Sequence, residues 1–296
     1  MGKMINYRVI FNPAAGNKNP EKLLRRIKEV FASCGNRVNY HVTTGPGDAV
    51  LAAEKAVRAG MEVIVAAGGD GTINEVVNGI AGTGAVLGVI PTGTGNDFAR
   101  ALGMPPGLED SCRQILAGST RTVDLGTVRG RKFINCAGVG FDADVARRTN
   151  RQRKYISGYW MYLLSVLEAL MVYRTVSVKI TLDGGKMLEC SPMLVAVGIG
   201  TSYGGGIEIV PDSVMDDGLF DVCVIDEVKG PNTLRYLYRA LQGRHTELAR
   251  TEIYRSRCVK LEMNTELPYH VEGEVFKADT LKFTLEPEAM RVIIPG

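Results

Sequence analysis

The run Gly68-Gly-Asp-Gly-Thr72 places one carboxylate, Asp70, inside a glycine-rich turn that directly follows the apolar stretch Val63–Ala67. Glycine lets the backbone turn sharply and approach a ligand closely, and a helix that begins after such a turn offers unpaired N–H groups to an anion. A bare carboxylate beside a phosphate is repulsive, so Asp70 implies either a bridging divalent cation or a proton-transfer task. The plainer alternative is that Asp70 only braces the loop, and the spacing alone does not decide between these interpretations.

Two further turns have a similar composition. Asn12-Pro-Ala-Ala-Gly16 follows the β-prone stretch Tyr7–Phe11. Pro91-Thr-Gly-Thr-Gly-Asn-Asp97 follows the apolar stretch 85–90. Because the carboxyl ends of parallel strands meet at one edge of a doubly wound sheet, we expect all three turns to lie together there. Their convergence indicates a triphosphate site more strongly than any single turn, since a triphosphate needs several donors and a bridging metal.

The elements that must position these turns follow from the hydrophobic pattern. As far as Gly103, short strands alternate with helical stretches, which predicts an α/β, mostly parallel, doubly wound domain. Two helical segments, 157–173 and 231–242, interrupt the rest of the chain. That part otherwise reads as successive strands, at 121–128, 132–137, 176–182, 188–199, 219–228, 252–263 and 275–285. We therefore expect a second, largely antiparallel β-sandwich domain, with the domains at residues 1–122 and 123–289 and residues 290–296 returning to the first.

Composition excludes several classes of function. The chain has 296 residues and a net charge of +3, which suits about two globular domains and is too weak to indicate nucleic-acid binding. Its six cysteines are scattered without a CxxC pair, which predicts reduced thiols in a cytoplasmic protein. The three histidines show no zinc-binding spacing, and the Walker A pattern is absent.

Carboxylates recur in two runs of the second half. Within Pro211–Asp221, adjacent carboxylates precede a glycine and repel each other unless a cation lies between them; the alternative is an exposed acidic turn. In His270-Val-Glu-Gly-Glu274, a carboxylate directly after a glycine turn is mobile enough to reach a substrate hydroxyl, as a general base must. The alternative is a solvated β-turn with two ordinary carboxylates.

A basic segment leads into an aromatic one. The basic residues are Arg147, Arg148, Arg151, Arg153 and Lys154. The stretch 155–164 that follows is rich in aromatic and apolar residues but is interrupted too early to span a membrane. This order suits an anionic membrane surface, although a core helix with a solvated start fits equally well.

The run GGDGTINEVVNG resembles the nucleotide-binding signature of the diacylglycerol kinase catalytic domain, a family that includes bacterial soluble lipid kinases and sphingosine kinases. A shorter form also occurs in NAD kinases, but the continuation Asn74–Gly79 favours the lipid kinases. The resemblance covers nearly the whole chain, because the turns, the acidic loop and the Glu-Gly-Glu run stand in family order. The family also carries a segment similar to 135–143, so Asn135, Gly138 and Gly140 are better interpreted as a tight turn than as a dinucleotide fingerprint.

The resemblance implies that ATP and Mg²⁺ serve to phosphorylate a membrane lipid alcohol, foremost diacylglycerol. It implies Glu274 as the general base and a magnesium ion tied to Asp70. A structural magnesium ion would bind the Asp217 side chain and the carbonyls of Val214 and Leu219. Glu272 stands where the family has aspartate, one methylene longer, which bears on the surrounding metal or water network rather than on the base. The nucleotide is expected to contact Asn12, Pro13, Ala14, Ala15, Gly16, Thr43, Gly68, Gly69, Asp70, Gly71, Thr72, Asn74, Glu75, Thr94, Asn96 and Asp97.

Other interpretations stay open. Within the class, the substrate could be another lipid alcohol, such as a sphingoid base or phosphatidylglycerol, and a catalytically silent relative could bind nucleotide as a regulator. From a different class, a NAD(P)-dependent oxidoreductase would use the G-x-G-x-x-A pattern at 138–143, although no acidic residue ends a second strand about 20 residues later. We expect a cytoplasmic protein, peripheral to the membrane, with a lipid partner and no nucleic acid; the sequence leaves a homodimer open.

Overall fold

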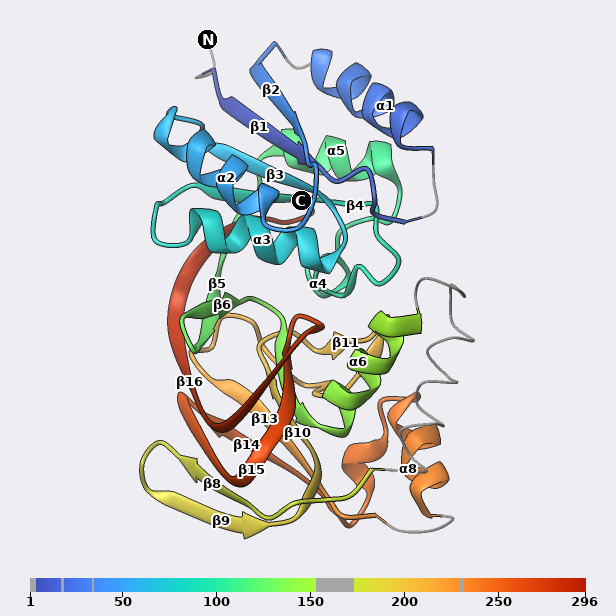
Figure 1. Ribbon diagram of the computed structural model, residues 1–296. Helices are drawn as coiled ribbons and strands as arrows, with labels where there is room; N and C mark the ends of the chain where they lie inside the picture. Colours follow the sequence, from blue (N-terminus) through green and yellow to red (C-terminus); the bar gives the residue numbers. More distant parts are fainter. Residues whose placement is uncertain (1–3, 17–18, 34, 153–172, 229–231) are drawn as a thin grey trace. The chain divides into compact units, whose positions relative to one another are not determined.

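The computed structural model describes residues 4–16, 19–33, 35–152, 173–228 and 232–296 (Figure 1). The chain divides into two compact units, the first formed by residues up to 125 together with 287–296 and the second by residues 126–286. Among the described helices, none is both long and apolar enough to cross a membrane.

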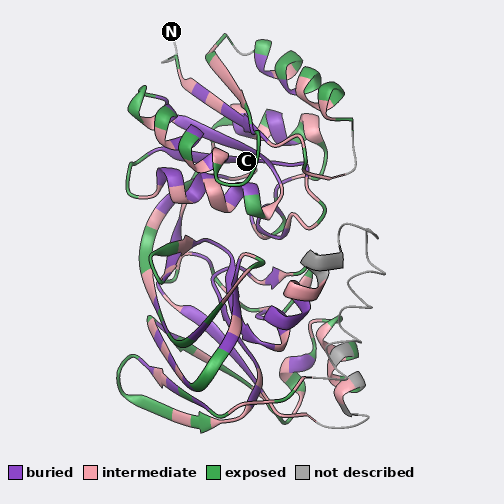
Figure 2. Cartoon of the chain, in the orientation of Figure 1, coloured by how far each residue is buried: buried purple, intermediate pink, exposed green. Residues whose placement is uncertain are grey.

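The first unit is a parallel sheet with helices on both faces (Figure 1). Its strands lie in the order β4-β3-β1-β2, all parallel: β1 (Asn6–Phe11), β2 (Arg37–Val42), β3 (Val63–Gly68) and β4 (Val86–Pro91). The helices are α1 (Pro20–Ala32), α2 (Asp48–Arg58), α3 (Asp70–Ile80), α4 (Asp97–Ala101) and α5 (Leu108–Ala117). Strands β3 and β4 are buried along their whole length, as their continuous apolar sequences require (Figure 2).

The second unit is largely antiparallel. Its main strands lie in the order β14-β13-β10-β7-β15-β16, with β8 beside β15, β9 beside β8, and β6 beside β5. Their bounds are β5 (Thr120–Val128), β6 (Arg131–Phe133), β7 (Cys136–Gly140), β8 (Val178–Leu182), β9 (Lys186–Cys190), β10 (Pro192–Gly198), β13 (Phe220–Asp226), β14 (Thr251–Ser256), β15 (Cys258–Val271) and β16 (Glu274–Ile293). The shorter elements are α6 (Phe141–Gln152), β11 (Ser202–Tyr203), β12 (Ile207–Glu208), α8 (Asn232–Ala240) and the 3₁₀ turn η1 (His245–Glu247). The α/β fold class is confirmed, with a parallel domain followed by an antiparallel, sandwich-like one.

Strand β16 is long, and its two halves pair with different strands. Its first half pairs antiparallel with β15. Near its end, Arg291 and Val292 pair in parallel with Val86 and Leu87 of β4. The chain therefore ends as an additional strand of the first sheet.

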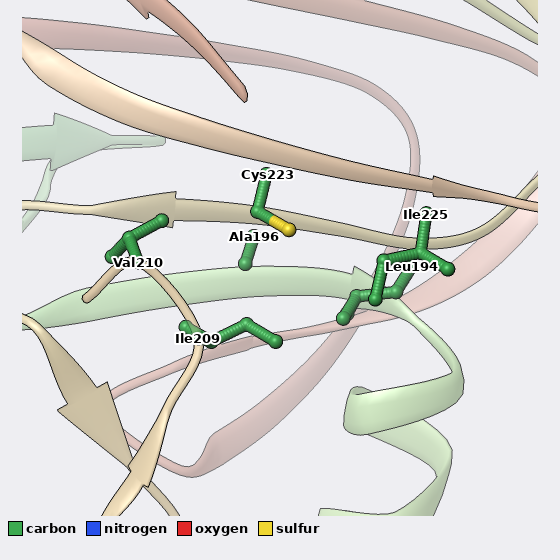
Figure 3. Packing of buried hydrophobic residues seen from close by; sticks show 6 residues of the cluster. All are labelled: Leu194, Ala196, Ile209, Val210, Cys223 and Ile225. Atoms are coloured by element: carbon green, nitrogen blue, oxygen red, sulfur yellow. The ribbon is translucent and has the colours of Figure 1, made fainter. Parts of the chain in front are cut away.

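One buried cluster in the second unit forms between two strands and a connecting segment (Figure 3). Leu194 and Ala196 of β10 face Cys223 and Ile225 of β13, and Ile209 with Val210 complete the cluster. All five cysteines in the described ranges are free thiols. Burial raises the pKa of the Cys223 thiol to about 12, so this sulfur belongs to the packing and is unreactive.

The structure also corrects several expected elements. Helices α5 and α6 were not predicted. Gly138 and Gly140, which we expected in a tight turn, instead belong to strand β7, which leads directly into α6. The expected strand at 252–263 is two strands, β14 and β15, that meet at Arg257. The stretches 132–137 and 188–199 likewise divide, into β6 with β7 and into β9 with β10. Most of the expected helix at 157–173 lies outside the described residues.

Candidate active site

The first two glycine-rich turns of the first unit are joined by hydrogen bonds. Asn12 follows β1, and its backbone N–H donates to the Ala67 carbonyl of β3 over 2.9 Å. The side-chain Nδ2 of Asn12 donates to Thr72 Oγ1 over 2.8 Å. The Asn12 Oδ1 atom accepts the N–H of Ala14 over 2.9 Å, which shapes the first turn. One side chain therefore fixes the turn after β1 to the turn after β3.

The third turn, after β4, lies against the other two, and glycines make this approach sterically feasible. A Cβ atom on Gly93 would lie 2.4 Å from the Cα atom of Gly69. A Cβ atom on Gly16 would lie 2.5 Å from the carbonyl oxygen of Thr92. Real Cβ contacts are never so short, so only glycine fits at these two positions. The structure thus brings the three predicted turns together at the carboxyl edge of the parallel sheet.

Asp70 begins α3, and its carboxylate reaches the neighbouring helix. Its Oδ1 atom accepts the N–H of Phe98 at the start of α4 over 3.0 Å. Burial raises the pKa of this carboxyl, and the negative charge of Asp97 raises it further. Two neighbouring carboxylates in a poorly solvated place favour a bound cation, and Arg100 already supplies one positive charge beside Asp97.

The third turn contains three of the expected nucleotide contacts. Asn96 adopts the left-handed conformation (φ 53°), and its side-chain amide exchanges two hydrogen bonds of 3.0 Å with the backbone of Gly93. The buried Asp97 forms an ion pair of 2.7 Å with Arg100. Thr94 is exposed, so its side chain is accessible to a ligand.

Other expected nucleotide contacts already have structural tasks. The Glu75 carboxylate accepts the N–H groups of Gly47 and Ala49 over 3.0 and 3.1 Å, so it caps the start of α2 from the neighbouring helix. Asn74 accepts the side-chain amide of Asn78 over 3.2 Å. Thr43, directly after β2, is buried. For these three residues, as for all the other expected contacts, binding of a nucleotide remains a prediction.

In the second unit, Glu274 stands at the start of β16, directly after a two-residue hairpin turn. The turn residues Glu272 and Gly273 have φ values of 52° and 80°, the left-handed pair that a type I′ turn requires. The Glu274 side chain is 60% exposed, and its Oε2 atom lies 2.8 Å from Nη1 of Arg131. The Arg131 guanidinium in turn lies 4.2 Å above the ring of Phe276, which holds the arginine in one orientation. Sequence reasoning missed Arg131, because no motif surrounds it.

Glu272 has a specific role that the sequence did not reveal. Its Oε1 atom accepts the N–H groups of Ile134 and Asn135 over 3.0 and 2.8 Å. Its own N–H donates to the carbonyl of Cys136 over 3.0 Å. The carboxylate therefore fastens the hairpin turn to the segment between β6 and β7.

The acidic loop before β13 partly satisfies its own charges. Asp217 Oδ1 accepts the N–H of Leu219 over 3.0 Å, and its second oxygen pairs with Arg255 of β14. Asp221 lies beside the same arginine, but its buried Oδ2 atom finds no hydrogen-bond partner in the described part of the chain. Burial raises the pKa of Asp221, while contact with Ser213 and the positive charge of Arg255 oppose that rise. The described residues contain no preformed cluster of three metal-ligating side chains, so any cation here would also need backbone carbonyls.

The sequence matches known proteins over both units. Residues 6–128 match the family described as the diacylglycerol kinase catalytic domain, and residues 135–294 match the YegS C-terminal NAD kinase beta sandwich-like domain. A diacylglycerol kinase of Bacillus subtilis (strain 168) is 36% identical over 270 residues, which covers 90% of this chain and 89% of the relative. A diacylglycerol kinase of Staphylococcus aureus (strain MRSA252) is 33% identical over 269 residues, which covers 90% and 85%.

A solved structure agrees with these matches. A Bacillus anthracis (strain Sterne) protein assigned to the diacylglycerol kinases superposes with a TM-score of 0.84 at 26% identity, over 99% of this chain and 98% of that one. A second structure from the same strain, at 24% identity and a TM-score of 0.82, shares the fold. The chain therefore belongs to the diacylglycerol kinase family and is a lipid kinase-type phosphotransferase.

Proposed function

We propose that this protein transfers the γ-phosphate of ATP to the hydroxyl of diacylglycerol and so forms phosphatidic acid. The observation that carries this proposal is the mutual packing of three glycine-rich turns at one edge of the parallel sheet. In phosphoryl transfer, the protein takes little part in covalent chemistry. Catalysis depends mostly on positioning the reactants and neutralising charge. The relatives named above support diacylglycerol as the acceptor.

The start of α3 is suited to receive the phosphates. Its N-cap residue, Gly69, has no side chain to satisfy the first N–H groups of the helix. Around Gly71, the described residues leave open space where a Cβ atom would point. The start of a helix without a side-chain cap, together with the helix dipole, therefore favours an anion at this place.

Asp70 and Asp97 would hold the magnesium ion that accompanies ATP, with Asp70 acting directly or through water. When bound, Mg²⁺ supplies positive charge that offsets the phosphates during transfer. A second ion would have a structural role at the acidic loop, with the Asp217 side chain and the carbonyls of Val214 and Leu219 as ligands. The unpartnered Oδ2 atom of Asp221 supports a cation near this loop.

Glu274 would take the proton of the lipid hydroxyl as that oxygen attacks the γ-phosphorus, while the bond from this phosphorus to the β–γ bridging oxygen breaks and ADP leaves. Its position directly after a glycine-containing turn and its exposure leave the carboxylate accessible to a substrate. Arg131 holds the carboxylate in the absence of substrate and directs it through the contact of 2.8 Å. The protein's residues thus bind the nucleotide, neutralise it and remove one proton.

A panel of lipid alcohols tests the proposed substrate. Labelled ATP is supplied with Mg²⁺ and mixed micelles that contain diacylglycerol, a sphingoid base, phosphatidylglycerol or no acceptor lipid. We expect label in phosphatidic acid at a kcat/KM well above that for the other lipids. Faster labelling of the sphingoid base or of phosphatidylglycerol would assign a different lipid kinase, and label in none of them would contradict the proposal.

A further inference from the structure

We propose that His270 is a positioning residue for the general base: its imidazole fixes the Glu272–Gly273 turn, and Asp142 selects the imidazole tautomer that can do so. The inference rests on the proposed role of Glu274. It assigns a task to two buried residues that nucleotide binding and proton removal leave unused.

Asp142 and His270 form a buried polar pair inside the second unit. The Nε2 atom of His270 on β15 lies 3.0 Å from Oδ2 of Asp142 on α6. His270 is 2% exposed and Asp142 is 8% exposed. The hydroxyl of Tyr203 donates to the same Asp142 oxygen over 3.0 Å, and its ring meets the imidazole edge-on. Burying polar side chains costs free energy unless they form hydrogen bonds, and these contacts supply them for Asp142 and His270.

The hydrogen bonds determine the tautomer of His270. An ionised carboxylate only accepts hydrogen bonds, so the Nε2 atom facing Asp142 must carry a proton. The backbone N–H of Gly273 donates to Nδ1 over 3.3 Å, so Nδ1 must be free of one. The neutral Nε2–H imidazole is the form that meets both requirements. A proton on Nδ1 would set two donors against each other and push the turn away.

The turn that His270 contacts is the one that places the base. Val271 and Glu274 are the first residue pair of the β15–β16 hairpin, with Glu272 and Gly273 between them. Glu272 is a non-glycine residue held in the left-handed region, so the turn needs contacts that keep it there. A displacement of about 1 Å at a catalytic group can reduce turnover by about 10²-fold. Support for the Gly273 N–H is therefore support for the position of Glu274.

The glycine at position 138 reserves the space for this pair. A Cβ atom on Gly138 would lie 1.8 Å from Oδ2 of Asp142 and 2.7 Å from Nε2 of His270. The volume above this glycine is thus filled by the protein's own carboxylate and imidazole. This accounts for one glycine of the G-x-G-x-x-A pattern without any dinucleotide.

Two substitutions at His270 separate positioning from simple packing. His270→Asn keeps an acceptor near the place of Nδ1 for the Gly273 N–H but cannot reach Asp142. His270→Gln keeps a donor near the place of Nε2 for Asp142 but withdraws the acceptor from Gly273. We expect kcat to fall at least about tenfold further in H270Q than in H270N, with the KM for ATP unchanged in both. Equal kcat values in the two variants, with only their melting temperatures lowered, would overturn the proposal.

Asp142→Asn supplies a second variant of unchanged volume in case H270Q does not fold. Its amide can donate to Nε2 and so favours the Nδ1–H tautomer, which opposes the Gly273 N–H. We expect a folded protein with kcat reduced about tenfold or more. Wild-type turnover in folded D142N would contradict the assignment.

Nitrogen-15 NMR of histidine-labelled protein provides a readout that does not depend on activity. The chain has three histidines, and comparison with H270N assigns the His270 signals. We expect the proton on Nε2 in the wild type; a proton on Nδ1 would overturn the proposal. The variant E274Q distinguishes the two levels of inference. An active E274Q removes the base assignment, whereas an inactive E274Q beside a fully active H270Q removes only the positioning role.

Discussion

At the scale of single residues, Asp70 shows a conflict between stability and function. Burial and the neighbouring Asp97 raise the pKa of its carboxyl, so keeping it ionised at neutral pH destabilises the folded protein without nucleotide. Asp70→Asn removes the charge but keeps an oxygen for the Phe98 N–H. We expect an equal or higher melting temperature in the absence of nucleotide and a kcat lower by about 10²- to 10³-fold. Calorimetry and a kinase assay measure the two effects, and a less stable but active D70N would contradict this account.

Glu272 gives a second prediction at this scale. Replacing it with alanine leaves the N–H groups of Ile134 and Asn135 without their carboxylate, and an unmet buried donor costs about 1–3 kcal/mol. We expect Glu272→Ala to lower the free energy of unfolding by that amount in urea titrations. Glu272→Gln keeps an accepting oxygen and is expected to lose less. Equal stability in all three proteins would show that these contacts contribute nothing.

The same residues show how far the sequence could predict the site. The glycine turns and Asp70 could be located because each lies in a short local pattern. The role of Glu272 could not, because the N–H groups that it binds are more than 130 positions earlier in the chain. Arg131 was missed for the same reason, since its contact with Glu274 spans 143 positions.

At the scale of elements, the 3₁₀ turn η1 places a buried histidine, His245, beside the cluster of β10 and β13. His245 Nε2 lies 3.0 Å from the carbonyl of Ile209, and its buried Nδ1 has no hydrogen-bond partner among the described residues. Burial lowers the pKa of this imidazole below its usual value of 6.5. Below pH 6.5, His245 is protonated in the unfolded chain but stays neutral in the folded protein. The free energy of unfolding is therefore expected to fall as the pH falls.

The pH dependence of unfolding measures this effect. A single such proton changes the free energy of unfolding by up to about 1.4 kcal/mol per pH unit below 6.5, until the folded-state pKa is reached. The variant His245→Gln can still donate to the Ile209 carbonyl but does not titrate. We expect its stability to fall less than that of the wild type between about pH 7 and pH 5. Parallel pH profiles for the two proteins would rule out His245 as a source.

Elements of strong local pattern were predictable, and the others were not. Strands β3 and β4 are continuous apolar runs, so their type and place followed from the sequence. Helix α5 is short, and one of its three buried residues, Ser111, Cys112 and Ile115, is polar, so the sequence contains no long apolar run at this place. Helix α6 begins directly at the end of β7, where Gly140 has a φ of 107°, and a run rich in glycine conceals such a start.

At the scale of the whole molecule, the proposed function requires the chain to reach a lipid substrate in a membrane. Two of the five basic residues expected to meet the lipid surface, Arg147 and Arg148, instead pair with the buried Asp144. The remaining three are Arg151, Arg153 and Lys154; the last two lie outside the described residues. We expect membrane attraction to depend on these three charges.

Vesicle co-sedimentation tests which of the five basic residues attract the membrane. Neutralising Arg151, Arg153 and Lys154 to glutamine is expected to weaken binding to anionic vesicles by about 1 kcal/mol per charge at low salt, and high salt should have the same effect on the wild type. Neutralising Arg147 and Arg148 serves as the matched control. We expect this double variant to be less stable than the wild type but to bind vesicles almost as strongly. Undiminished binding of the triple variant would leave the segment with a packing role alone.

The proposed function depends most on Glu274 as the general base. The most direct measurement is the turnover of Glu274→Gln with diacylglycerol and ATP, alongside its affinity for ATP. We expect kcat to fall by about 10²- to 10⁴-fold, as the loss of a general base predicts, with the Kd for ATP nearly unchanged. An E274Q protein that keeps most of its turnover, or that loses ATP binding together with its activity, would contradict the account.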